Sequence, residues 1–207
     1  MSDPSQPAID PALVARVKGI LLQPHAEWAR IDGEFATTKT LFTRYAMILA
    51  AIGPLCGLIG AQLMPLGLRM PITGAVIVAI LSYLLSLAAV YVLGLIINAL
   101  APTFGGVSDP VQAMKVAVYS WTAAWLAGVF GLVPVLGVLT ILGLYSFYLL
   151  YIGLPLLMKT PDDKKVGYFV VTLILTLIAF AIISAIVGTV SASFTVTSAM
   201  LGGLAGL

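Results

Sequence analysis

The chain has 207 residues, of which 61% are hydrophobic and only 9% are charged. Soluble domains average about 45–50% apolar and about 25% charged residues, so this composition excludes a soluble monomer and predicts an integral membrane protein surrounded by lipid. A net charge of +2 is too small for a nucleic-acid partner. Cys56 and His25 are the only cysteine and histidine. They leave no pair for a disulfide or a local metal site, and we expect no cofactor.

Residues 1–40 form a polar segment ahead of the first long apolar run. The segment lacks the basic start of a secretory signal, so we expect no cleavage. Asp10 can cap a helix that is amphipathic, with Arg16 and Lys18 on its polar side. The apolar residues on the opposite side, which should lie along the membrane surface, are Leu13, Val14, Val17, Ile20 and Leu21.

A second short helix is predicted from Pro24. It contains Glu27 and Trp28, and the Trp28 indole has an apolar body and a polar N–H that suit the headgroup region. Two roles stay open for this pair of helices. They either dock a membrane surface or a partner, or they cover the cytoplasmic ends of the transmembrane helices.

Long uncharged stretches mark the membrane spans. A bilayer core about 30 Å thick takes about 20 helical residues. The stretch 116–158 has 43 residues with Gly131 and Pro134 near its middle, which predicts a hairpin of two spans. For the last span, Thr160 can form the cap and Pro161 the first residue. Five spans are predicted, at about residues 41–63, 72–100, 111–132, 135–158 and 161–187.

Residues 189–207 carry six hydroxyl residues and three glycines, a weak pattern that leaves a sixth span open. The predicted fold is therefore an all-α, polytopic membrane bundle of five transmembrane helices with an amphipathic N-terminal segment. Its parts are a cytoplasmic segment (1–40), a five-span transmembrane domain (41–188) and a small-residue C-terminal tail (189–207).

Basic residues fall almost entirely on one side of these spans. With the N-terminus in the cytoplasm, Arg69 is the one basic residue outside, and nine Lys and Arg lie inside together with all eight acids. The positive-inside rule therefore places the N-terminus in the cytoplasm and, after five spans, the C-terminus outside.

Two stretches carry a family resemblance: RVKGILLQPHAEW at 16–28 and LMKTPDDKKVGY at 157–168. With AVYS at 117–120 and YSFYLLYIG at 145–153, they resemble the prokaryotic branch of the Yip1 family over roughly residues 11–187. This resemblance implies a five-span protein of the bacterial inner membrane. For eukaryotic members it implies a role in vesicle trafficking with Rab GTPases and related membrane proteins as partners. This chain lacks their Asp-Leu-Tyr-Gly-Pro motif and has a short N-terminal segment, so Rab binding is not carried over.

Gly53, Gly57 and Ala61 repeat every four residues in the first span. Small residues at this spacing let two helices approach closely, so they predict a packing seam. The seam faces either another span of the same chain or a second protomer, which leaves self-association open.

Polar and aromatic side chains on the third and fourth spans suggest a second candidate site. Tyr119 and Ser120 on the third span could line a cavity with Tyr145, Tyr148 and Tyr151 on the fourth. The same residue types also form interfacial aromatic belts and interhelical hydrogen bonds, so both interpretations stay open.

No titratable residue lies near the centre of a predicted span. Ion-coupled transporters usually carry such residues, and Arg44 and Lys115 are near enough to span ends to reach the cytoplasmic headgroups. His25 has no evident nucleophile beside it, and Cys56 is expected to stay a neutral thiol in lipid, so we expect no enzyme. Two functions remain: a non-enzymatic organiser of membrane or membrane-protein partners, as the resemblance implies, or a carrier or channel for an apolar or uncharged solute or lipid.

The predicted topology can be tested with reporter fusions after Met64, Leu100, Leu132, Met158 and Leu207. Because nine basic residues should be retained inside, the reporters should read outside, inside, outside, inside and outside in that order. A cytoplasmic signal at Leu207 would contradict the five-span topology.

Overall fold

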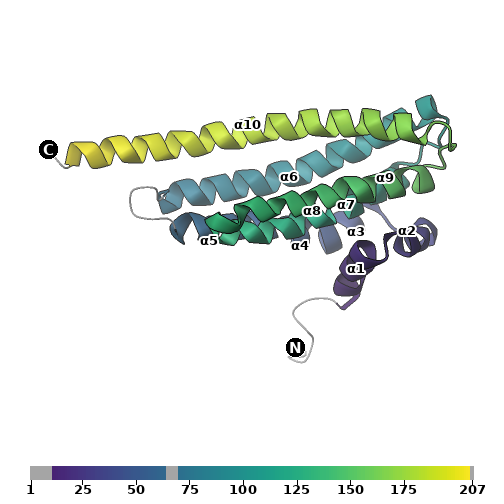
Figure 1. Cartoon of the computed structure of the whole chain (residues 1–207), viewed down its shortest axis with the longest axis horizontal. Helices are drawn as coiled ribbons and strands as arrows, with labels where there is room; N and C mark the ends of the chain where they lie inside the picture. Colours follow the sequence, from purple (N-terminus) through teal and green to yellow (C-terminus); the bar gives the residue numbers. More distant parts are fainter. Residues whose placement is uncertain (1–10, 64–69, 206–207) are drawn as a thin grey trace.

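The described part of the chain is helical throughout and contains no β-strand. A computed structural model describes the backbone of residues 11–63 and 70–205, and their side chains except Pro134, Gly137 and residues 195–205. The long helices form an elongated bundle, and two N-terminal helices pack beside it (Figure 1). The α-helices are α1 (Pro11–Leu22), α2 (Pro24–Gly33), α3 (Thr38–Leu41), α4 (Met47–Ala50), α5 (Ile52–Leu63), α6 (Ile72–Leu100), α7 (Pro110–Ser120), α8 (Thr122–Ala127), α9 (Tyr145–Leu157) and α10 (Lys165–Ala205). A π-helix, η1 (Phe42–Ala46), and three 3₁₀ segments, η2 (Ala101–Phe104), η3 (Gly128–Leu132) and η4 (Pro134–Leu144), join them.

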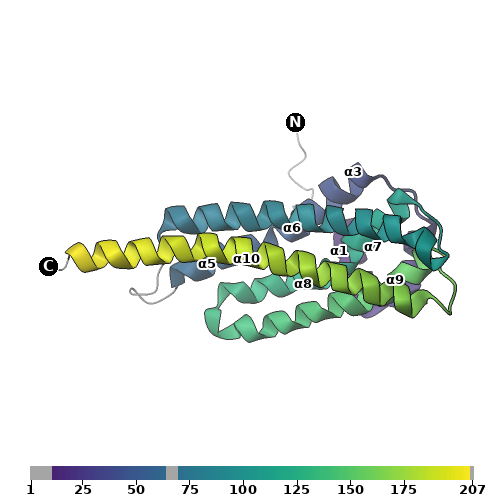
Figure 2. The same ribbon diagram turned by 90° about the horizontal axis from the view of Figure 1, so that it is seen from above.

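The all-α membrane bundle predicted from the sequence is confirmed. Four helical stretches in the described residues are long and apolar enough to cross a membrane: Thr38–Leu63, Ile72–Phe104, Val138–Leu157 and Lys165–Phe194. The remaining predicted span corresponds to α7, α8 and η3 in succession, from Pro110 to Leu132. This segment turns back into η4 and α9 as the expected hairpin, whose tip lies at the left of Figure 2.

The α7 helix occupies the centre of the bundle. Every residue from Ala113 to Ser120 is buried, because α6 packs on one side and α9 on another. The helix begins with Pro110 in its first turn, and an Asp109 carboxylate oxygen accepts hydrogen bonds from the Val111 and Gln112 amides at 2.9 and 3.0 Å. Such a cap satisfies amides that a helix start leaves without partners.

The break between α7 and α8 has a side-chain cause. The Ser146 hydroxyl of α9 accepts a hydrogen bond from the Ala124 amide at 2.9 Å, and the Thr122 hydroxyl donates to the Tyr119 carbonyl at 2.7 Å. Hydroxyls that enter the helical hydrogen-bond ladder in this way interrupt it and bend the helix. The sequence predicts one continuous span here because the Ser146 hydroxyl comes from a different helix.

The fifth span differs from the sequence prediction at both ends. The chain leaves α9 at Lys159, which has a left-handed φ of 53°, and the Thr160 amide bonds to the Pro155 carbonyl at 3.0 Å. Thr160 therefore belongs to the end of α9, and α10 begins at Lys165 instead of Pro161. Asp10, the expected cap of α1, lies outside the described residues.

The α10 helix also continues through the predicted tail to Ala205, a length of 41 residues. Its hydroxyl residues do not end the helix: the Thr189 hydroxyl donates to the Ile186 carbonyl at 2.9 Å, and Ser193 donates to Val190 at 2.7 Å. In lipid, a hydroxyl that bonds back to its own helix is satisfied without breaking it. The proposed domain boundary at residue 188 therefore falls inside a continuous helix.

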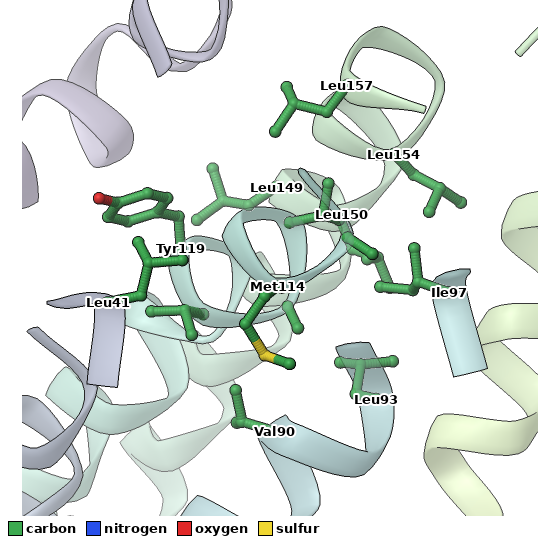
Figure 3. Close-up of a cluster of buried hydrophobic side chains, with 14 of the residues drawn as sticks. Leu41, Val90, Leu93, Ile97, Met114, Tyr119, Leu149, Leu150, Leu154 and Leu157 are labelled. Carbon is green, nitrogen blue, oxygen red and sulfur yellow. The ribbon is translucent and has the colours of Figure 1, made fainter. Parts of the chain in front are cut away.

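A buried core joins the C-terminal end of α6 to α7 and α9 (Figure 3). It brings together Ile97 of α6, Met114 and Val116 of α7, and Leu150 and Leu154 of α9, all nearly or fully buried. The first span begins beside the middle of the C-terminal half of α6, because Phe42 packs edge-on against Tyr91, nine residues before the last residue of α6. The first span therefore leaves one side of α7 and α9 uncovered, and α1 and α2 pack on that side.

Glycines set the contact between α5 and η3. A Cβ on Gly128 would lie 2.6 Å from the Cα of Gly53, and a Cβ on Gly60 would collide with the Gly131 carbonyl oxygen. Both clashes are with backbone atoms, which cannot rotate away. The two segments therefore need glycine at these positions to approach as closely as they do.

Replacing Gly60 with Ala should destabilise the bundle, because the added methyl group must push η3 away from α5. We expect a loss of about 1–3 kcal/mol, seen as a lower melting temperature in detergent. Gly57→Ala is the matched control, since a Cβ at Gly57 meets nothing within 4 Å. Equal melting temperatures for the two variants would disprove this contact.

Candidate functional site

The N-terminal helices are held against the bundle by fully buried side chains. Ile20 of α1 and Trp28 and Ile31 of α2 have no exposed surface. The Trp28 ring lies against Gly153 of α9, where a Cβ would come within 2.6 Å of the ring, and it meets Tyr119 edge-on with ring centroids 6.4 Å apart. Gly153 thus provides the space that seats Trp28.

Arg16 faces inward, which corrects the expectation that it points away from the bundle with Lys18. Its guanidinium pairs with Glu27 and Glu34 and lies 5.5 Å from the centre of the Tyr119 ring. Burial opposes the charge, but the hydrogen bond that Arg16 donates to Glu34 and the nearby Tyr119 and carboxylates leave the pKa of Arg16 raised above its ordinary value. The acids of α2 determine this orientation, and an amphipathicity pattern in α1 alone does not contain that information.

Lys115 also behaves differently from the sequence expectation of reaching the headgroups. It is only 3% exposed, and its ammonium donates to the backbone carbonyls of Ile31 at 2.9 Å and Glu34 at 2.5 Å. These carbonyls lie at the C-terminal end of α2, where the helix dipole favours a positive charge. A lysine of the central helix therefore caps an N-terminal helix.

A third set of contacts fixes Asp32 of α2. Its carboxylate pairs with Lys159, the residue with left-handed φ after α9, and its carboxylate and backbone carbonyl accept hydrogen bonds from the Gln112 side chain at 3.2 and 3.1 Å. We call the whole set of charged residues that joins α1 and α2 to the bundle the N-terminal latch; it consists of Arg16, Glu27, Arg30, Asp32, Glu34, Lys115 and Lys159.

The residues proposed to line a cavity are brought together only in part: the rings of Tyr145 and Tyr148 pack against each other with centroids 5.2 Å apart. Tyr119 and Ser120 are buried in the core, while Tyr145 donates to the Leu21 carbonyl of α1 at 3.0 Å. Tyr148 and Tyr151 are partly exposed, and Tyr151 packs edge-on against Phe169 of α10. Tyr119 and Tyr145 instead contact the N-terminal helices, through Trp28 of α2 and Leu21 of α1.

A different cavity, which we call the lateral groove, lies among α5, α6, α8 and α10 and has a volume of about 730 Å³. Its walls are mostly small or apolar side chains, and none of the lining residues is charged. The Trp125 indole donates to the Ser86 hydroxyl at 3.0 Å across one wall. Residues that represent the four helices in its lining are Gly57 and Ala61 of α5, Ser86 and Ala89 of α6, Trp125 of α8, and Ser184 and Gly188 of α10.

The predicted seam residues divide between two surfaces. Gly53 faces Gly128 in the contact with η3, and the Gly57 backbone lies near Gly131. Gly53, Gly57 and Ala61 also line the lateral groove, and a Cβ at Gly57 would enter open space. Gly60, which the four-residue repeat does not include, makes the closest approach.

His25 and Cys56 lie on different helices of the structure. His25 is exposed on α2, and Cys56 is a free, partly buried thiol on α5. Among residues 11–63 and 70–205, no group of three or more His, Cys, Asp or Glu could hold a metal ion.

Comparisons with known proteins identify what this architecture is similar to. The Yip1 domain model matches residues 18–184, which confirms the family resemblance seen in the sequence. Inner membrane protein YohC from Escherichia coli K12 and its counterpart from Escherichia coli O6:H1 are each 24% identical over 183 residues, covering 84% of this chain and 94% of the relative. No solved structure matches the chain.

The latch predicts that Lys115→Met will release the N-terminal helices, because the buried Ile31 carbonyl and the partly buried Glu34 carbonyl lose their donor. One such loss costs about 1–3 kcal/mol, which makes local opening roughly 5- to 150-fold more frequent, and the loss of both should increase it further. Limited trypsin digestion of the protein in detergent should then cleave faster between Arg16 and Arg30. The control is Lys39→Met, which removes an exposed lysine of α3 outside the cleaved region. Unchanged cleavage in Lys115→Met would contradict the role of Lys115.

Proposed function

This chain belongs to the Yip1 family of membrane proteins, and from the geometry of its lateral groove we propose that it is a non-enzymatic organiser of membrane components. The main observation behind this proposal is a cavity of about 730 Å³. Its lining contains no charged residue and combines small residues from three long helices. Such a cavity can hold an apolar membrane component, whereas catalysis and ion coupling require titratable groups at the site.

Retention of a component fits this geometry better than its transfer across the membrane. The groove lining on α10 begins at Thr176, and the buried core of the bundle occupies the region nearer the start of that helix. A carrier for an apolar solute or lipid would need a route through this core. Densely packed leucines such as Leu150 and Leu154, both without exposed surface, fill that region (Figure 3).

The N-terminal latch supports a scaffold with a defined cytoplasmic face. It joins α1 and α2 rigidly to the same bundle that forms the groove, through Lys115 of the central helix. With the N-terminus in the cytoplasm, as the distribution of basic residues favours, the latch would lie on the inner side and the groove toward the outer side of a bacterial inner membrane.

The proposal can be tested by photo-crosslinking in intact cells with a diazirine-bearing aliphatic residue in place of Ala89, which lines the groove. We expect one discrete adduct that survives purification in mild detergent. The same probe in place of the neighbouring Ala88, which is exposed, is the control and should give only diffuse labelling of bulk lipid. If the two positions label alike, the groove holds no specific component and the proposal fails.

A further inference from the structure

We propose that the lateral groove binds the hydrocarbon tail of a membrane lipid, from the leaflet opposite the N-terminal helices. This inference rests on the proposed function and names the component that the groove retains. Three observations carry it: the dimensions of the groove, the way its ends are closed, and the chemistry of its walls.

The groove has the volume of a small-molecule pocket. Its lining on α10 runs from Thr176 to Ser191, which is about 22 Å along a helix axis. A volume of about 730 Å³ lies within the roughly 300–1,000 Å³ of pockets that hold single small ligands. A long pocket of this volume suits a slender, flexible hydrocarbon chain.

Both ends of the groove are closed by contacts within the chain. At the far end, Phe194 of α10 packs so closely on Gly74 of α6 that a Cβ there would lie 2.7 Å from the ring. At the near end, Tyr168 of α10 bonds to the Ile97 carbonyl of α6 at 2.5 Å. The opening is therefore lateral, toward lipid. Its length of about 22 Å exceeds the roughly 15 Å that one leaflet contributes to a core about 30 Å thick, so a tail from one leaflet can occupy most of it.

The walls select for hydrocarbon and not for a headgroup. No lining residue carries a charge that could pair with a phosphate. Polar side chains in the walls bond to the protein itself: Trp125 donates to Ser86 at 3.0 Å, and Thr176 donates to the Thr172 carbonyl at 2.7 Å. Burial of apolar surface then supplies the binding free energy, so affinity should follow the tail and be similar for anionic and zwitterionic lipids.

Tryptophan fluorescence offers a direct test in vesicles that contain lipids brominated on their acyl chains. The chain has three tryptophans. Trp125 lines the groove and is only 5% exposed, while Trp28 is fully buried under the N-terminal helices and supplies a constant background. In a Trp121→Phe background, quenching by bromine therefore reports on lipid that enters the groove. We expect saturable quenching at a low fraction of brominated lipid, equal for phosphatidylglycerol and phosphatidylethanolamine.

Filling the groove provides the matched variant. Gly57→Phe places a ring in the groove, where a Cβ meets no atom within 4 Å, and it should reduce quenching at least about twofold by occupying the space of the tail. Gly33→Phe is the control: its Cβ also meets no atom within 4 Å, but it lies on α2, away from the groove. Melting temperatures in detergent should verify that both variants stay folded.

Three outcomes would overturn the inference. Quenching that rises linearly with brominated lipid and is equal in Gly57→Phe and the parent means ordinary surrounding lipid only. A several-fold preference for one headgroup means that the tail is not what is recognised. A crosslinked adduct at Ala89 with the mass of a protein means that a partner's helix occupies the site, in which case the organiser function stands while the lipid assignment fails.

Discussion

The buried ammonium of Lys115 is the interaction on which the arrangement of this protein depends. A charge inside a membrane bundle is costly unless hydrogen bonds replace its water, and here two carbonyls at the end of α2 do so. The hydrogen-bond acceptors of this ammonium on the central helix α7 therefore come from the N-terminal segment and not from the other spans. The ammonium requires the N-terminal segment, which in turn brings Trp28 and Arg16 onto Tyr119 and extends the buried core outside the spans.

The two halves of the bundle follow different packing rules as a result. Near the latch, large side chains such as Leu150, Met114 and Ile97 fill the space between helices, as in a soluble core. Farther along, contacts depend on glycine, because no hydrophobic effect drives apolar helices together in lipid and close backbone approach must compensate. One glycine-rich face of α5 packs against η3, and the neighbouring face of α5 lines the lateral groove.

This division connects the structure to the proposed function. A rigid latched end can hold the orientation of α6 and α10, and the space between them farther along stays open to the membrane. The lining of the groove contains no charged residue, which is the observation behind the proposal that it retains an apolar component. Membership in the Yip1 family and similarity to a bacterial inner membrane protein are consistent with an organising role and do not by themselves specify the component that is held.

The sequence alone determined that the chain is an all-α membrane bundle, because uncharged stretches can be measured directly against the thickness of a bilayer. The predicted second span, residues 72–100, coincides with α6, and the hairpin turn falls near Pro134 as expected. Family membership was also readable from local motifs. The extent of α10 was not, since hydroxyls and glycines suggest a tail until their bonds to the helix itself are seen.

Tertiary structure alone decided which residues meet. Arg16 and Lys115 look like surface charges in the sequence, and only the fold shows that α2 supplies their partners. The five residues Tyr119, Ser120, Tyr145, Tyr148 and Tyr151 have suitable chemistry for a cavity. The fold brings only the rings of Tyr145 and Tyr148 together, while Tyr119 packs against Trp28 and Tyr151 against Phe169. The groove combines four helices distant in sequence, and its small and apolar lining residues are common in every span, so no sequence pattern predicts it. Small side chains form a cavity only through the space that they leave between helices, and that space exists only once the helices are packed.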